Sequence, residues 1–194
     1  MRPRQFEEQR VLDAAFAHFW RKGVRGTSLT DIAREVGVQR GSLYNAYGSK
    51  EALFLRAYRQ YANDYLDNVA RRVSRGPLRQ RLLDFYDYSI SNYCTGTPHR
   101  GCPTTRALME IPSLADTQDN TKQVFADLLQ RLIELISGAL TDGFKHDEFT
   151  GDPHLTAEHL VAVARGLVVM EKAFGDEAQL RRIAEFTVDA VVAS

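Results

Sequence analysis

The segment from Thr27 to Lys50, TSLTDIAREVGVQRGSLYNAYGSK, constrains the fold more than any other part of the chain. Its apolar spacing predicts two short helices, at about 29–36 and 39–47, joined by a tight turn. Ala33 is small enough for two steeply crossing helices to approach closely. Gly37, four residues later, can adopt the positive φ that the turn requires. The pattern therefore predicts a helix-turn-helix.

The second of these helices is expected to pack through Leu43. It carries polar and aromatic side chains on the opposite, outward face. In a helix-turn-helix this face lies against the major groove, so we expect it to contact DNA. Arg40 is the best candidate to read bases, because a guanidinium pairs bidentately with guanine. We expect Ser42 and Asn45 to add secondary base contacts, and Gly41 to allow close approach.

The ends of the helices predict contacts with the DNA backbone, which supply affinity rather than sequence preference. Thr27 and Ser28 stand at the start of the first short helix, where free N–H groups and hydroxyls can meet a phosphate. Tyr47 and Lys50 follow the second, and we assign them to phosphates as well. Tyr44 is expected on either a phosphate or a thymine methyl group.

The charge distribution agrees with this interpretation. Residues 1–50 carry nine Lys and Arg against five Asp and Glu, a net charge of +4, while the remainder carries −4. A basic head on an acidic body is typical of a protein with one end on phosphate. Arg2 and Arg4 either form an arm that reaches the DNA or belong to a disordered terminus.

The segment GVQRGSLYNAYGSKEALF, with TSLTDIA before it, resembles the signature of the tetracycline-repressor (TetR) family of bacterial transcription regulators. The resemblance is strong from about Phe6 to Leu55 and architectural beyond. It implies an N-terminal DNA-binding domain, a variable helical body that responds to a small molecule, and a dimer. Asn45 and Ala46 replace residues that are frequently histidine or aromatic in the family, which we expect to change the DNA sequence read rather than the fold.

Helical periodicity, punctuated by glycine and proline, continues to the end of the chain and predicts an all-α fold of about nine helices. We expect residues 1–48 to form the helix-turn-helix domain and residues 49–194 a ligand-binding and dimerisation domain. Pro112 is expected to end the sixth helix and Gly143 the seventh. The expected helices span about 4–22, 29–36, 39–47, 50–74, 77–93, 104–111, 121–141, 153–174 and 176–192.

The last two predicted helices, at about 153–174 and 176–192, are apolar in more directions than one core face requires. A second buried face against another copy of the chain would explain this, and the resemblance implies the same homodimer. The alternative is a central helix pair inside a monomer.

A small-molecule effector is expected in the body, where aromatic side chains and methionines are numerous. Taken singly, most of these residues are more often core than ligand contacts. The candidate ligand residues are Tyr58, Tyr61, Phe85, Tyr86, Tyr88, Tyr93, Cys102, Met109, Phe125 and Met170.

Cys94, His99 and Cys102 suggest an alternative, a metal- or redox-sensing regulator, because thiolates and imidazole bind soft metals and thiols can be oxidised. The spacing C-x4-H-x2-C is not a standard zinc motif and lacks a fourth ligand. Cys102 is as well explained as a buried small residue at a helix start. No cofactor is expected.

An enzyme is the remote alternative, because the acids are scattered and no orienting partner accompanies Cys102 and His99. The densest apolar run, Leu160 to Met170, is broken by Arg165 and Gly166, so no membrane span is expected. Two cysteines are too few for a disulfide framework, which favours a cytoplasmic protein.

Overall fold

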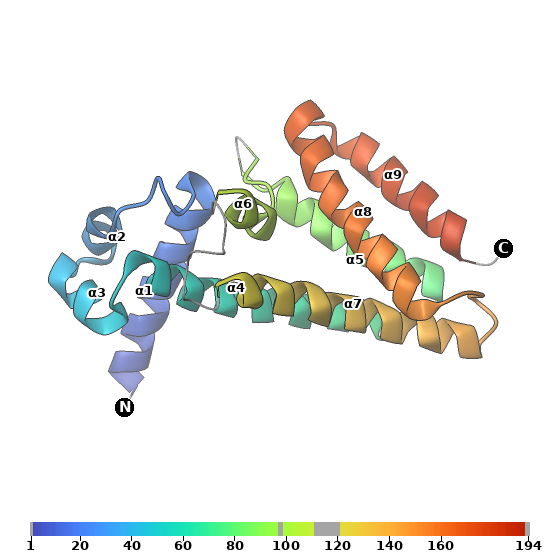
Figure 1. Ribbon diagram of the computed structural model, residues 1–194, viewed down its shortest axis with the longest axis horizontal. Helices are drawn as coiled ribbons and strands as arrows, with labels where there is room; N and C mark the ends of the chain where they lie inside the picture. The colour runs from blue at the N-terminus through green and yellow to red at the C-terminus, as the bar shows by residue number, and fades with distance from the viewer. Residues whose placement is uncertain (1, 97–98, 111–120, 193–194) are drawn as a thin grey trace. The chain divides into compact units, whose positions relative to one another are not determined.

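The computed structural model describes residues 2–96, 99–110 and 121–192, and these residues form nine α-helices and no strand (Figure 1). The expected all-α class is confirmed. The expected end of the sixth helix at Pro112, and the side chains of Arg2 and Arg4, lie outside the described residues. The helices are α1 (Arg2–Lys22), α2 (Leu29–Val36), α3 (Arg40–Tyr47), α4 (Lys50–Val73), α5 (Leu78–Tyr93), α6 (Pro103–Glu110), α7 (Thr121–Lys145), α8 (Pro153–Phe174) and α9 (Glu177–Val191).

The chain divides into two compact units. The first comprises Met1–Asp64 and Arg106–Val124, and the second Tyr65–Thr105 and Phe125–Ser194. The helix-turn-helix domain expected at residues 1–48 falls within the first unit, and its boundary at residue 48 remains a prediction.

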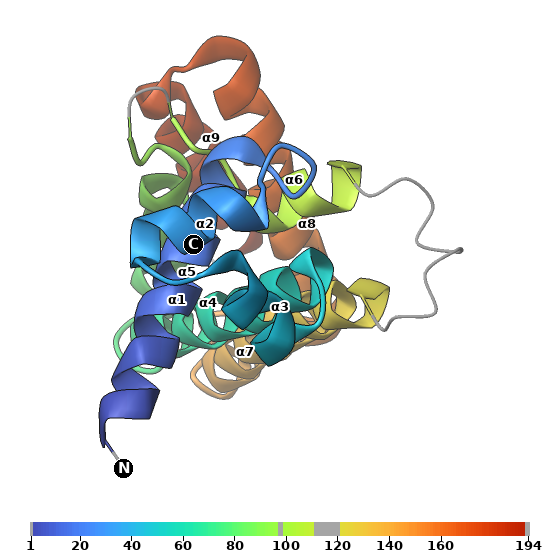
Figure 2. The same cartoon turned by 90° about the vertical axis from the view of Figure 1, so that its left-hand side faces the viewer.

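In the first unit, α2 packs against both α1 and α3 (Figure 2). The core includes Phe19 from α1 and Phe54 from α4, whose rings meet edge to face with centroids 5.1 Å apart. Arg106 from α6 donates hydrogen bonds to the carbonyls of Trp20 and Arg21, each at 3.1 Å. These carbonyls belong to the last turn of α1, so Arg106 satisfies acceptors that the helix itself cannot.

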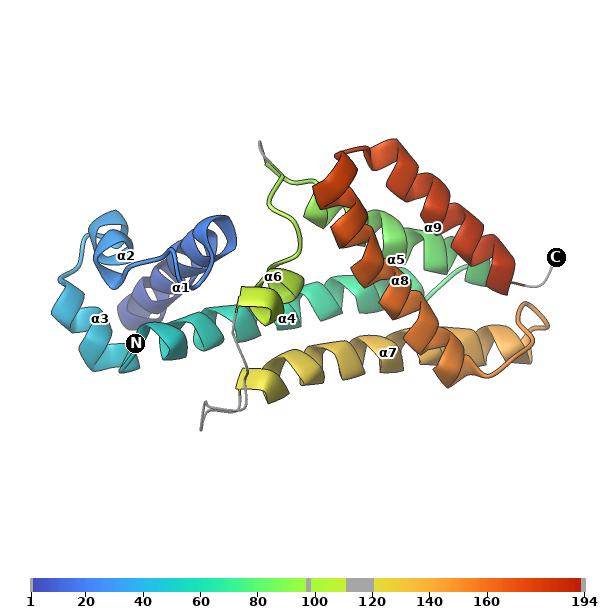
Figure 3. The ribbon, with the colours of Figure 1, turned by 45° about the horizontal axis from the view of Figure 1, so that its top comes forward.

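In the second unit, α5, α8 and α9 pack against one another (Figure 3). Fully buried side chains such as Phe85, Leu160 and Val188 join them. Asp152 begins α8 by accepting hydrogen bonds from the backbone N–H groups of His154 and Leu155, at 2.8 and 3.0 Å. This is the N-cap that the sequence Asp-Pro predicts.

Gly143 does not end α7, contrary to expectation, because the helix continues to Lys145. The reason is a close contact within the second unit: a Cβ on Gly143 would lie 2.6 Å from Cδ2 of Leu78. The glycine lets α5 approach α7. The helix ends two residues later, where the N–H groups of His146 and Glu148 both bond the Gly143 carbonyl, at 3.1 and 2.9 Å.

Arg81 joins three segments at one end of the second unit. Its side chain is 6% exposed, its Nε donates to the Val73 carbonyl at 2.6 Å, and its Nη1 contacts Oδ2 of Asp142 at 2.8 Å. The hydrogen bond from Arg81 lowers the pKa of Asp142. One guanidinium thus caps the end of α4 and ties it to α7.

We predict that Arg81→Met lowers the free energy of unfolding by about 2 kcal/mol, because the buried Val73 carbonyl loses its donor. Urea unfolding measures this. The control is Arg79→Met two residues earlier, which removes an exposed pair with Asp189 and should change the midpoint little. Equal losses in both variants would contradict the assignment.

The same pair predicts a pH dependence. Because Asp142 has a lowered pKa in the folded protein, its contribution is complete above the ordinary carboxyl value of about 4 and is lost as pH falls through the folded value. The stability difference between wild type and Arg81→Met should therefore shrink below about pH 4.

Candidate nucleic-acid interface

The turn between α2 and α3 is made as its sequence predicts. Gly37 has φ of 72°, in the left-handed region, and its N–H bonds the Ala33 carbonyl. The N–H of Val38 bonds the same carbonyl at 3.0 Å. Ala33 is 3% exposed at the packed side of α2. The small residue and the left-handed glycine together redirect the chain into α3.

Two polar contacts fix α2 against α1. Arg10 donates from Nη2 to the carbonyl of Val36, in the last turn of α2, where a positive charge is favourable. His18, with a side chain only 7% exposed, lies 2.6 Å from the Glu35 carboxylate through Nε2. These contacts hold α2 against α1 and so fix the position of the turn from which α3 begins.

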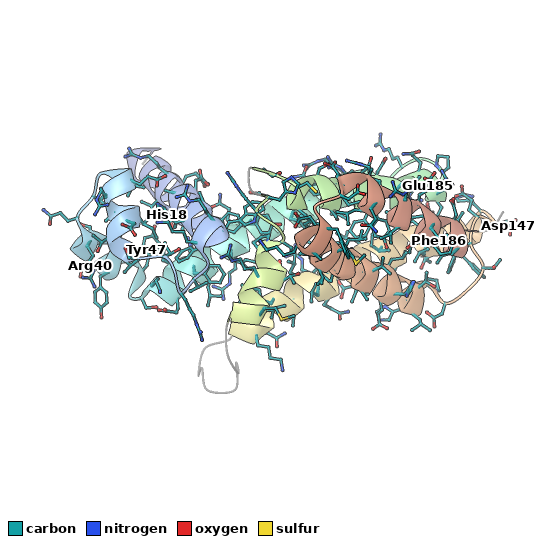
Figure 4. All side chains as sticks on the ribbon, turned by 90° about the horizontal axis from the view of Figure 1, so that it is seen from above. His18, Arg40, Tyr47, Asp147, Glu185 and Phe186 are labelled. Carbon is teal, nitrogen blue, oxygen red and sulfur yellow. The ribbon has the colours of Figure 1, made fainter. Side chains whose placement is uncertain are left out.

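The outer face of α3 is exposed as expected. Leu43 is buried at 3% exposure, whereas Arg40, Gly41, Ser42 and Asn45 face solvent. Tyr44 is 61% exposed. Among the described residues Arg40 makes no hydrogen bond or ion pair, and Figure 4 shows it at the outer edge of this unit.

Tyr47 and Lys50 lie where the prediction places them, at the end of α3 and the start of α4, and both are partly exposed. Burial, followed by the nearby Glu8, raises the pKa of Tyr47, so its phenol is a neutral donor. No described residue pairs with the Lys50 ammonium. A neutral donor and a free cation at adjacent helix ends suit phosphate oxygens.

Thr27 is a correction. Its side chain is 3% exposed, and its hydroxyl donates to the carbonyls of Gly23 and His18, at 2.7 and 3.2 Å. It braces the end of α1 and cannot also reach a phosphate. Thr30 carries an exposed hydroxyl on the first turn of α2.

Ser28 is exposed and caps α2, accepting from the Asp31 N–H at 3.1 Å. It also donates to the Asp31 carboxylate, and this bond lowers the pKa of that group. A phosphate contact at Ser28 would therefore come through its backbone. Val38, after the turn, is 39% exposed and lines a cleft of about 400 Å³ beside α3.

The candidate ligand residues are divided between the two units. Tyr61 of the first unit stacks on Phe16 with centroids 4.7 Å apart, in an aromatic group that includes Tyr58. Met109 is 81% exposed, which corrects its assignment to a pocket. Phe85 and Phe125 are fully buried, and Met170 is partly exposed. Tyr88 stacks on Tyr65, and the guanidinium carbon of Arg72 lies 4.1 Å from the centre of the Tyr88 ring. Tyr86 is buried and donates to the Leu160 carbonyl at 2.9 Å.

Cys94, His99 and Cys102 each have separate surroundings in the second unit. His99 Nδ1 lies 2.9 Å from Glu171, and Cys102 Sγ accepts from Arg165 at 3.3 Å. No group of three or more His, Cys, Asp or Glu that could hold a metal occurs within the described ranges. Burial raises the pKa of the Cys94 thiol to about 11, which keeps it protonated and weakly nucleophilic.

In the sequence, Arg165 stands out only as a break in an apolar run. In the structure it contacts both Tyr93 and Cys102, two of the expected ligand residues. The signal was present in the sequence, since a charge inside a mostly apolar helix demands a partner.

Across the described residues, no helix is both long and apolar enough to cross a membrane.

We predict opposite effects for two glycines of the helix-turn-helix. Gly37→Ala should lower the free energy of unfolding of this unit by about 1–2 kcal/mol, because a Cβ opposes the left-handed conformation. Gly41→Ala should raise it by about 0.5–1 kcal/mol, because alanine favours the helix and the added Cβ meets no atom within 4 Å. Thermal unfolding measures both.

If Gly41 allows close approach to DNA, the more stable Gly41→Ala protein should also bind DNA more weakly. Unchanged DNA affinity in that variant would remove Gly41 from the interface.

Two family models match the chain. "Bacterial regulatory proteins, tetR family" covers residues 11–57, and "Tetracyclin repressor-like, C-terminal domain" covers residues 79–187. The HTH-type transcriptional repressor NemR of Escherichia coli is 24% identical over 155 residues, 78% of this chain and 76% of the relative. The uncharacterized HTH-type regulator YezE of Bacillus subtilis is 32% identical over 46% of this chain, and the match spans about half of that relative (47%).

Solved structures share the fold. The crystal structure of reduced E. coli NemR has a TM-score of 0.85 at 21% identity, covering 96% of this chain and 97% of that one. A cysteine mutant of the TetR-family regulator CifR, in complex with a 26-bp operator DNA, has a TM-score of 0.81 at 21% identity. That match covers 94% of this chain and 95% of the other.

Proposed function

The chain belongs to the tetracycline-repressor family of bacterial regulatory proteins and is a DNA-binding transcription regulator, and we propose that a small molecule releases it from a palindromic operator. The observation that carries this proposal is Arg40, which is exposed on α3 after the turn at Gly37 and has no partner in the part of the chain that the structure describes. The CifR structure supports it, because that protein of the same fold holds operator DNA. We place its action in the cytoplasm, where operator DNA would lie.

Within this proposal, Arg40 reads bases, with Ser42, Asn45 and Tyr44 beside it. Tyr47 and Lys50 contact phosphates. The N-terminus of α2 contributes free backbone N–H groups, with the Thr30 hydroxyl in the place first assigned to Thr27.

We predict that Arg40→Ala reduces discrimination between the preferred operator and altered sequences by about 1–3 kcal/mol. Lys50→Ala should instead weaken binding to all sequences and reduce the salt dependence of affinity by about one phosphate contact. Competition gel shifts at two salt concentrations, on an operator selected from random DNA, measure both effects.

The matched control removes a positive charge from the end of α7, as Lys145→Ala. It should keep wild-type affinity and salt slope. If Arg40→Ala kept full sequence preference, Arg40 would not be a base-reading residue.

The proposed dimer uses the outer faces of α8 and α9. Members of the family bind operators as dimers. The exposed apolar side chains of these helices include Val169 at 60%, Phe174 at 64% and Phe186 at 77%. Figure 4 labels Phe186 and Glu185 on α9. Large apolar groups in solvent are typical of a surface that a partner covers, and a two-fold dimer would present two copies of α3 to successive major grooves about 34 Å apart.

We predict that Phe186→Glu weakens the dimer at least tenfold, because a carboxylate would be buried without a partner. Sedimentation equilibrium measures the dissociation constant. The control is Phe144→Glu, a phenylalanine of α7 that is 55% exposed, which should leave the dimer intact. Dissociation by Phe144→Glu alone would place the interface on α7 instead.

A further inference from the structure

One side of α8 faces the segment that leads from α5 into α6. Arg165 contacts Cys102 and Tyr93, while Glu171, six residues later, pairs with His99. Val168 lies between them and packs in a buried cluster with Tyr93 and Cys102. All these residues belong to the second unit.

Among the described residues, the polar groups within hydrogen-bond distance of the Arg165 guanidinium are two phenols and a thiol. Nη2 donates to the Tyr93 hydroxyl at 2.7 Å, Nη1 donates to Cys102 Sγ at 3.3 Å, and the Tyr65 hydroxyl also bonds the side chain. The guanidinium carbon lies 5.7 Å from the centre of the Tyr93 ring. Burial raises the pKa of both Tyr93 and Tyr65, so neither phenol supplies a negative charge.

Three other arginines of this unit contact a carboxylate directly. Arg79 contacts Asp189 at 2.7 Å, Arg81 contacts Asp142 at 2.8 Å, and Arg181 contacts Glu177 at 2.6 Å. No carboxylate among the described residues lies within 4 Å of Arg165, and its buried Nε has no hydrogen-bond partner.

Glu171 does not fill this role. Six residues correspond to about 9 Å along the helix, and its carboxylate already pairs with His99. A positive charge and a buried N–H without a partner oppose folding unless another group satisfies them. Such departures from local optimisation are expected at binding sites.

We propose that Arg165 binds the carboxylate of the effector, with Tyr93 and Cys102 orienting the guanidinium. This inference rests on the proposed function, because it names the chemical class of the effector. A single guanidinium with one unsatisfied N–H suits a singly charged group. The neighbouring Tyr93 and Val168 suit an apolar body on the ligand. Arg165 as a whole is partly exposed, although its Nε atom is buried.

Cys102 lies a few residues along the chain from the first unit. It immediately precedes α6, and four residues later Arg106 donates to the last-turn carbonyls of α1. A ligand that displaces Cys102 from Arg165 would act on the segment that enters α6.

The test measures binding of benzoate and octanoate to the full-length protein by calorimetry, with benzamide and octanamide as uncharged counterparts. We expect a carboxylate to bind more tightly than its amide. Arg165→Gln should weaken that binding roughly 10- to 100-fold, as expected for loss of a charge-assisted hydrogen bond. Arg165→Lys should recover part of it, and Arg79→Gln should match wild type.

Two results would overturn the proposal. One is that neither carboxylate binds more tightly than its amide, or that Arg165→Gln binds it as wild type does. The other is thiolate absorbance from Cys102 at pH 7 in a Cys94→Ser protein, because Arg165 would then already have a counter-charge. The calorimetric test requires no DNA. A failure of this proposal is therefore distinct from a failure of the proposed function, which would appear as absence of operator binding by the unliganded protein.

Discussion

The close packing of α2 between α1 and α3 is the constraint on which the DNA-facing side of the protein depends. Ala33 permits the approach, and Gly37 turns the chain through a conformation that a Cβ would oppose. Arg10 then holds α2 through its backbone, and His18 holds it through the side chain of Glu35. Since Leu43 is committed to the core, the opposite face of α3 must face outward. The arrangement of potential base contacts thus follows from packing rather than from the contact residues themselves.

The second unit uses arginine in three physically different ways. Arg79 makes an exposed ion pair, which solvent weakens. Arg81 is buried and satisfies both a helix-terminal carbonyl and a carboxylate, so its charge and its donors are matched. Arg165 contacts a phenol and a thiol, and no described residue bonds its Nε. The three arginines therefore differ both in their exposure to solvent and in whether a carboxylate balances their charge. A carboxylate beside a guanidinium compensates its charge within the fold, whereas a guanidinium without one can accept the anion of a ligand.

Much of the fold was predictable because helices depend on neighbours three and four residues apart. The apolar spacing of α2 and the turn at Gly37 are both local, and the structure confirms them. The errors share a different cause. Gly143 resembles a helix stop, yet Leu78, distant in sequence, explains it. Thr27 resembles a phosphate ligand, yet carbonyls of α1 take its hydroxyl. In each case a long-range partner decided the role of the residue.

By itself, the sequence determined the all-α class, the helix-turn-helix, and the outward placement of Arg40, because periodicity, glycine conformation and charge act over a few residues. The tertiary structure alone decided which polar groups are satisfied. Met109 is exposed, Cys94, His99 and Cys102 have separate surroundings, and Arg165 contacts Tyr93 and Cys102. A buried charge is stable or costly according to which atoms surround it. Those atoms come from segments more than sixty residues apart, whose meeting no local pattern records.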